Sequence, residues 1–289
     1  MKLCKGLTVA SIGAVITACQ ILGSALPGQA VILSTGIVEA PGVVDVNSGQ
    51  VGNLDVSTGI FTPFIKGGLP FTDLALNDTG ELFAITYNRQ LYSINPSSGS
   101  STFIGGGDNT TVYFGLGFDK NNGLYTTDLN GNFYSVNEST GSASLIANTG
   151  LSFISDIVFD PRINRFFGLS SIVGGSDSTL FSVDLNGAAT PIGNVGSADV
   201  LGLAYDNGTL YAYTNDRRQL IINETTGAGV FDKNITGITG EIFGAASSIS
   251  EAKSVPEPTT LAGTISAIFA SSLMKLKRTS KHKHKLSHK

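Results

Sequence analysis

The middle of the chain alternates apolar and polar residues in short runs that are separated by Gly, Asn, Asp, Ser and Thr. Each run is too short to form a useful helix, and its period of two is that of a half-buried strand. The pattern therefore predicts an all-β body made of many short strands joined by turns.

One turn motif recurs five times between these runs: an apolar residue, then Asp or Asn, then a polar stretch that ends in Gly. The Asp or Asn positions lie 40, 42, 47 and 39 residues apart. We interpret them as turn-forming residues, because an Asp or Asn side chain supports a turn and Gly provides the positive φ angle. These positions are Asp55, Asn95, Asn137, Asp184 and Asn223.

A second motif, an apolar run that ends in Asp or Asn, alternates with the first at Leu74–Asn77, Leu116–Asp119, Ile157–Asp160 and Leu203–Asp206. Each repeat thus contains four strand-like runs in about 42 residues. Four antiparallel strands in a repeat of this length are the blade of a β-propeller. A two-sheet sandwich is the main alternative, but it gives no reason for a fixed period.

The ends of the body predict the number of blades. Val43 to Leu54 aligns with Tyr125 to Val136 and would supply the second and third strands of a blade without a first strand. Gly240 to Ala246 resembles an opening strand with nothing after it. If these N- and C-terminal strands share one blade, the ring closes without open edges. Four complete blades and one shared blade make five.

Charge and composition narrow the possible functions. Between Val31 and Ala252 there are 21 Asp and Glu but 8 Lys and Arg, which gives 8 − 21 = −13. Such an acidic body repels phosphate backbones, so we expect no nucleic-acid partner. Every Cys and His lies near an end of the chain, which excludes disulfides, Cys/His zinc sites and His-based catalysis for the body. These residues are Cys4, Cys19, His282, His284 and His288.

The remaining candidates for chemistry are carboxylates. Asp73 and Asp156 occupy equivalent positions before the second motif, where other repeats have Gly115 and Gly202. Paired carboxylates can hydrolyse glycosides, but two acids among many are weak evidence. We therefore predict no catalytic residue and no cofactor.

Calcium is a further possibility for the body. Asp119–Gly123 and Asp128–Asn132 offer oxygen ligands on tight turns, the ligands that Ca²⁺ takes. Neither segment has the bidentate Glu of an EF-hand loop, and Asn-Gly turns between strands need no metal. We interpret both segments as turns and predict no metal site.

Residues 1–30 have the pattern of a secretory signal peptide. Lys2 and Lys5 precede a short apolar run, and small residues lead to a cleavage site after Ala30. A second interpretation stays open, because Ile16–Cys19 resembles a lipobox, in which the Cys is lipidated after cleavage. Both interpretations predict export.

The C-terminus contains three elements in order: a Pro-Glu-Pro motif, an apolar stretch from Leu261 to Met274, and a basic cluster. Together they resemble the PEP-CTERM sorting signal of Gram-negative and cyanobacterial surface proteins. The resemblance implies that an exosortase-type membrane protease recognises the motif and removes the tail. The motif is Val255, Pro256, Glu257 and Pro258, and the basic cluster that stops transfer is Lys275, Lys277 and Arg278.

Elementary physics agrees with such a tail. Two prolines keep the motif extended, the form in which a protease takes its substrate. Lysines hold the end of the tail in the cytoplasm by the positive-inside rule. We expect a membrane helix at 259–276, longer than the apolar stretch itself because flanking residues extend it to bilayer thickness.

The sequence therefore predicts a signal peptide at 1–30, a propeller at 31–252 and a sorting tail at 253–289. We expect an exported non-enzymatic protein, anchored in the inner membrane before processing and afterwards at the cell surface or outside the cell. The tail's resemblance implies association with extracellular polysaccharide or biofilm matrix. Two alternatives stay open: a secreted lactonase or glycosidase that uses carboxylates and a divalent cation, and a propeller that only contacts another surface protein.

Overall fold

The computed structural model of the protein describes residues 31–36, 38–40, 43–45, 47–107, 111–170 and 177–248. In these segments the chain forms the strands β1 to β22 and no helix. The predicted all-β class is thereby confirmed.

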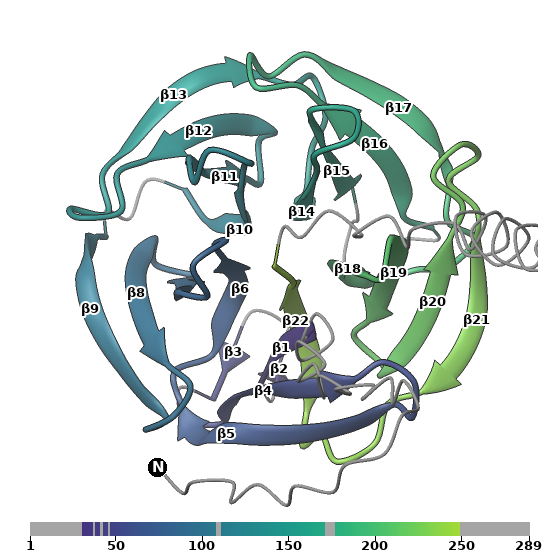
Figure 1. Ribbon diagram of the computed structural model, residues 1–289. Helices are drawn as coiled ribbons and strands as arrows, with labels where there is room; N and C mark the ends of the chain where they lie inside the picture. Colours follow the sequence, from purple (N-terminus) through teal and green to yellow (C-terminus); the bar gives the residue numbers. More distant parts are fainter. Residues whose placement is uncertain are drawn as a thin grey trace, which may run out of the picture.

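Five four-stranded antiparallel sheets stand around a central axis, as Figure 1 shows. The innermost strands β22, β6, β10, β14 and β18 contact one another around that axis. The predicted five-bladed propeller is therefore confirmed.

Four blades consist of strands that are consecutive in the chain and that follow one another from the axis outward. Blade 2 is β6 (Phe71–Leu76), β7 (Leu82–Thr86), β8 (Gln90–Asn95) and β9 (Ser100–Gly106). Blade 3 is β10 (Tyr113–Phe118), β11 (Leu124–Asp128), β12 (Asn132–Val136) and β13 (Ala143–Asn148). Blade 4 is β14 (Ile154–Asp160), β15 (Arg165–Ser170), β16 (Thr179–Val183) and β17 (Ala189–Asn194). Blade 5 is β18 (Val200–Asp206), β19 (Thr209–Thr214), β20 (Arg218–Ile222) and β21 (Gly229–Asn234).

Blade 1 is shared between the two ends of the body, as predicted. Its order is β22 (Glu241–Ala246), β1 (Val31–Gly36), β4 (Gly49–Asp55) and β5 (Ile60–Gly68). One detail of the prediction was wrong: the second strand is Val31–Gly36, not the segment that begins at Val43. Val43–Val44 instead forms β3, which pairs with β2 (Val38–Ala40) in a small hairpin outside the blade.

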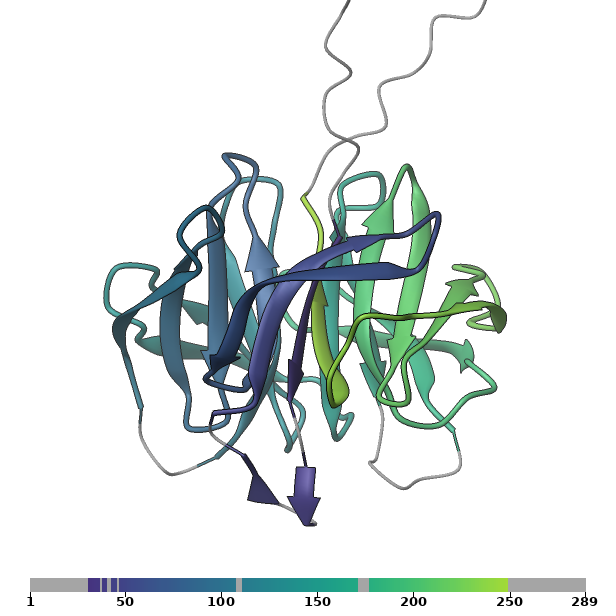
Figure 2. The same ribbon diagram turned by 90° about the horizontal axis from the view of Figure 1, so that it is seen from below.

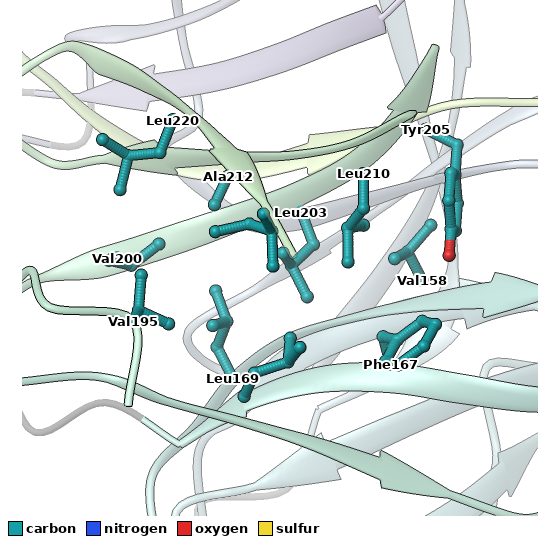
Figure 3. Close-up of a cluster of buried hydrophobic side chains, with 12 residues drawn as sticks. Val158, Phe167, Leu169, Val195, Val200, Leu203, Tyr205, Leu210, Ala212 and Leu220 are labelled. Atoms are coloured by element: carbon teal, nitrogen blue, oxygen red, sulfur yellow. The ribbon is translucent and has the colours of Figure 1, made fainter. Parts of the chain in front are cut away.

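The core lies between neighbouring blades. Inner strands are packed on both faces, so all seven residues of β14 are buried, whereas most residues of the outer strand β13 are exposed. Figure 3 shows one such layer between blades 4 and 5, where Val158 and Phe167 face Leu203 and Leu210. The strands are therefore half-buried outside and fully buried inside, which is why their apolar alternation weakens towards the axis.

The five repeated turns join the third and fourth strands of each blade. In each one the Asp or Asn oxygen accepts backbone N–H groups from residues two and three, or two and four, positions later in the turn. A Gly with positive φ closes each turn. The structural interpretation of Asp55, Asn95, Asn137, Asp184 and Asn223 is confirmed.

These turns also join blade to blade. Gly227 has a φ of +79°, and a Cβ there would lie 2.5 Å from the carbonyl oxygen of Gly193 on the outer strand of the preceding blade. Only Gly tolerates both the backbone conformation and the contact. The turn motif is thus required by the packing of the ring as well as by the hairpin.

Both ends of the described ring lie on one face. Ile32 pairs with Ala246 in antiparallel strands, so the start of β1 is beside the end of β22. Figure 2 shows the chain leaving β22 at the upper face, opposite the β2–β3 hairpin at the bottom. We call this upper face the terminal face; the turns after the inner strands and the five repeated turns lie on it too.

Truncation after Thr239 tests ring closure. It removes β22, uncovers one edge of β1 and exposes the inner sides of neighbouring blades, where Ile242 is fully buried. Truncating one such Ile to Ala costs about 2–5 kcal/mol, against a total stability of about 5–15 kcal/mol. We expect loss of the cooperative thermal transition in circular dichroism.

Truncation after Ser248 is the matched control, since it also removes the C-terminal tail but keeps every strand of the ring. It should melt like the full chain. Equal melting of the two truncated proteins would contradict closure by β22.

Candidate functional site

The inner strand of every blade has an irregularity at the same height on the axis. The register of the inner strand pair shifts there in all five blades. Such a bulge turns one residue aside and leaves nearby backbone N–H groups without a ladder partner. The residues at this height are Asp73, Gly115, Asp156, Gly202 and Gly244.

The three glycines at this height are closely packed, and one of them makes room for an aspartate. A Cβ on Gly244 would lie 2.3 Å from Asp73 Oδ1, one on Gly115 would lie 2.5 Å from Thr127 Oγ1, and one on Gly202 would lie 3.0 Å from the Cβ of Ala245. Both aspartates are completely buried. The axis therefore holds two carboxyl groups and has no space for a third side chain.

The two carboxyls bind backbone amides of several blades. Asp73 accepts N–H groups of Leu74 through Oδ1 (2.8 Å) and of Leu116 in blade 3 through Oδ2 (2.6 Å). Asp156 Oδ2 accepts the N–H groups of Leu203 in blade 5 (2.6 Å) and of Ala245 in blade 1 (3.4 Å). The pair thus satisfies amides that the bulges leave unpaired.

The two carboxyl groups also lie close enough to interact with each other, which brings blades 2 and 4 together at the axis. Burial, and then the negative charge of Asp156, raise the pKa of Asp73 well above its usual value. Burial also raises the pKa of Asp156, against hydrogen bonds that favour its charged form. Two carboxylates in contact cannot both be ionised at low cost, so the buried pair favours a form that holds a shared proton.

Asp156 Oδ1 marks the place for this proton. Among the hydrogen-bonding groups of the described residues, no N–H or O–H reaches this atom. The other three carboxylate oxygens of the pair each accept a backbone amide. A proton between Oδ1 and Asp73 therefore completes the network.

Beyond the aspartates, on the terminal face, the axis widens into a cavity of about 340 Å³. Its walls are the ends of the inner strands and include Leu76, Phe118, Val158 and Ala246. The completely buried Asp73 and Asp156 are not among its lining residues. The cavity is therefore a blind funnel, and its size is that of a small-molecule pocket.

A polar cluster forms one side of its rim, at blades 4 and 5. The Arg162 guanidinium donates to Asp160 (Nε–Oδ1 2.9 Å, Nη2–Oδ2 2.8 Å) and to Glu224 (Nη2–Oε2 2.7 Å). It also donates to the Tyr205 hydroxyl (3.2 Å), which donates to Glu224 Oε1 (3.1 Å). We call Asp160, Arg162, Tyr205 and Glu224 the rim cluster.

Burial and the charges of Asp160 and Glu224 raise the pKa of Tyr205 strongly, so its hydroxyl stays protonated. Hydrogen bonds to Asp160 and Glu224 raise the pKa of Arg162 further above its ordinary value. At neutral pH the cluster thus has two carboxylates, one guanidinium and one neutral hydroxyl. Its net charge is −1.

The sequence did not identify this cluster. In the sequence Asp160 is only the end of an apolar run, and Arg162 and Glu224 are 62 positions apart. The repeat contains the signal that could have identified it. In aligned blades, the turn after an inner strand lies beside the turn between the third and fourth strands of the next blade. Arg162 and Glu224 occupy those two turns.

The structure brings Asp73 and Asp156 together, as a catalytic pair would require, but buries both beneath the cavity floor. The calcium candidates have their oxygens engaged by the protein. Asp119 Oδ1 accepts N–H groups of Asn121 and Gly123. Asp128 accepts backbone amides through Oδ1 and the Tyr134 hydroxyl (2.9 Å) through Oδ2. Among described residues, no group of three or more His, Cys, Asp or Glu could hold a metal ion.

The predicted signal and sorting residues lie outside the described part of the chain. These are Ala30 at the cleavage site, the motif Val255, Pro256, Glu257 and Pro258, and the cluster Lys275, Lys277 and Arg278. No helix in the described segments is long and apolar enough to cross a membrane, and the helix expected at 259–276 is not among them.

No protein-family model and no curated protein sequence matches the chain. Many solved structures are similar in fold. A chain in the crystal structure of a nidogen/laminin complex is 11% identical, with a TM-score of 0.54 over 78% of this chain and 100% of that one.

A structural-genomics protein of unknown function from Bacteroides thetaiotaomicron is 16% identical, with a TM-score of 0.51 over 76% of this chain and 64% of that one. Virginiamycin B lyase from Staphylococcus aureus is 12% identical, with a TM-score of 0.44 over 70% of both chains. At these identities the first two likenesses concern the fold alone.

The axial pair predicts a pH-dependent stability. Both pKa values are raised in the folded state, so above about pH 4 the unfolded chain releases protons that the folded one keeps. The free energy of unfolding should therefore fall as pH rises from about 4, by about 1.4 kcal/mol for each pH unit by which a folded pKa exceeds the unfolded one. Thermal melts between pH 4 and 9 measure this.

Two amide variants test the position of the proton. In Asp156→Asn the amide nitrogen takes the place of Oδ1 and donates to Asp73, so stability above pH 6 should rise and the pH dependence should shrink. In Asp73→Asn the amide nitrogen must face the N–H of Leu74 or Leu116, which costs about 1–3 kcal/mol at all pH values. The opposite ranking of the two variants would refute this assignment.

Proposed function

We propose that this protein is exported and displayed at the cell surface as a non-enzymatic β-propeller, processed through its C-terminal sorting tail. The proposal rests on three sequence elements that follow one another in the tail. They are Val255–Pro258, then the apolar stretch, then the basic residues Lys275, Lys277 and Arg278. An exosortase-type protease is the partner that such a tail requires.

The positions of the two ends support this proposal. Cleavage after Ala30 would make Val31 the first residue, and Val31 is the fully buried first residue of β1. The processed chain would thus begin with the strand that holds β22 in the ring. Removal of a tail that starts after β22 would likewise leave every strand in place.

The axis supports a non-enzymatic role. Asp73 and Asp156 are the carboxyls that the sequence offered for catalysis, and both are inaccessible and engaged with backbone amides. No Cys or His lies between Val31 and Ser248. The cavity above them instead has the apolar walls and few polar groups of a binding site.

Association with extracellular polysaccharide or with another surface protein rests on the tail's resemblance to those of matrix-associated proteins. The body's charge of −13 (8 − 21) favours neutral or cationic partners over anionic ones. A displayed propeller that only contacts another protein is compatible with the same tail.

One observation favours the alternative of a secreted hydrolase: the two equivalent aspartates do meet at the axis and share a proton. A hydrolase would need substrate to reach them. Assays with lactones and aryl glycosides discriminate, because the hydrolase would lose turnover in Asp156→Asn, whereas our proposal expects no turnover in the wild type.

Processing is tested by producing the full chain with and without an exosortase-type protease. We expect the protease to shorten the chain by the tail and to move it from the membrane fraction to the surface or medium, as mass spectrometry of each fraction shows. Triple substitution of Pro256, Glu257 and Pro258 by Ala should keep the full-length chain in the membrane.

Pro96→Ala, in the turn after β8, is the matched control and should be processed like the wild type. Retention of an intact tail in the presence of the protease, with the wild-type motif, would overturn the proposed processing.

A further inference from the structure

The axial cavity has two unlike sides. Leu76 of blade 2, Phe118 of blade 3 and Ala246 of blade 1 give it an apolar wall. Asp160, Arg162 and Tyr205 of blades 4 and 5 line the opposite side, and Glu224 bonds to them from the neighbouring turn. A molecule that fills the cavity must therefore have an apolar body and a polar head on one side.

The floor restricts the shape of that molecule. Asp73 and Asp156 close the axis and have no exposed surface, so nothing passes through the ring. A ligand must enter and leave by the terminal face. A compact group fits such a blind funnel, whereas a polymer could insert only an end or a side branch.

The charge of the rim restricts the head group. Asp160 and Glu224 against Arg162 leave a net charge of −1 at the cluster. A monocation would bring the cluster to neutrality, whereas a carboxylate would raise its charge to −2. Within hydrogen-bonding distance and partly shielded from water, this difference is large.

The terminal face around the cavity has further acidic residues. Burial and the charge of Glu81 raise the pKa of Glu138, and burial and the charge of Asp55 raise the pKa of Asp206. These four acids lie in turns and at strand ends of the terminal face, outside the lining of the cavity. They belong to the acidic excess of the body, which favours the approach of cations to this face.

We propose that the axial cavity is a binding site for a compact amphiphilic cation, whose apolar body packs on Leu76, Phe118 and Val158 and whose ammonium head lies at the rim, beside Tyr205 and the half-buried Glu224. Tyr205 connects the two parts of the site: its ring packs in the layer between blades 4 and 5, and its hydroxyl belongs to the rim cluster. Figure 3 shows Tyr205 at the edge of that layer. The site is independent of the sorting tail.

Three probes with one rigid apolar body test the proposal: 1-adamantylmethylamine, 1-adamantylmethanol and 1-adamantanecarboxylate. Each is titrated by ligand-observed NMR into the full chain in lipid nanodiscs, with empty nanodiscs as the blank. We expect saturable binding of the amine at about millimolar concentration or below, about tenfold or more tighter than the carboxylate, with the alcohol between them. The preference should weaken as salt is added.

Glu224→Gln removes one rim charge without changing the volume of the cavity. The amine should lose about tenfold in affinity, and the alcohol should bind as before. Glu241→Gln is the matched control. Glu241 begins β22 at the opposite end of the axis, so the substitution removes the same charge far from the rim. It should change none of the three affinities.

Leu76→Trp fills the cavity and should abolish binding of all three probes, while Leu145→Trp on the exposed face of β13 should not. Circular-dichroism melts establish that each variant is folded. Equal affinity of carboxylate and amine for the wild type, or amine affinity unchanged in Glu224→Gln, would overturn the charge preference. Absence of saturable binding to the wild type would overturn the site.

Discussion

The ring depends on the supply of acceptors for backbone amides at its axis. Each inner strand bulges at one height, and the N–H groups beside the bulges face a centre where no further strand can pair with them. An unpaired buried amide is costly, so acceptors must be provided there. Two aspartates meet this need for Leu74, Leu116, Leu203 and Ala245, and through their mutual interaction they connect all five blades. Gly244 follows from the same constraint, because a Cβ there would collide with the Asp73 carboxyl group.

Much of the architecture could be predicted from the sequence because the repeat expresses a packing rule. Every blade needs the same turn between its third and fourth strands, so Asp55, Asn95, Asn137, Asp184 and Asn223 recur with a Gly that the preceding blade presses against. The shared blade also followed, since a closed ring requires β22. The second strand of blade 1 was misplaced because residues 37–48, with the β2–β3 hairpin, interrupt the repeat. An alignment without gaps selects the segment at Val43, which is closer to β4 in the sequence. The strand that pairs with β4 in space begins at Val31.

The candidate site was harder to predict, for a physical reason that differs between its two parts. Repeat alignment identified Asp73 and Asp156 as equivalent, but equivalence does not tell whether two side chains on a ring meet or point apart. That depends on the residues at the same height in the other blades, Gly115, Gly202 and Gly244, of which the repeat pattern identifies the first two. Arg162 and Glu224 meet because their turns are neighbours across a blade boundary, a relation that no local pattern along the chain contains.

A closed axis also changes where function can lie on this propeller. With an open channel the inner strands could present side chains to a substrate along their whole length. In this ring Asp73 and Asp156 fill the axis below the cavity, so on the terminal face the inner strands are accessible at their ends and at the turns after them. Those turns lie on the face where β1 begins and β22 ends. The same pair that holds the blades together therefore forms the floor of the cavity, on the face where the described ring both begins and ends.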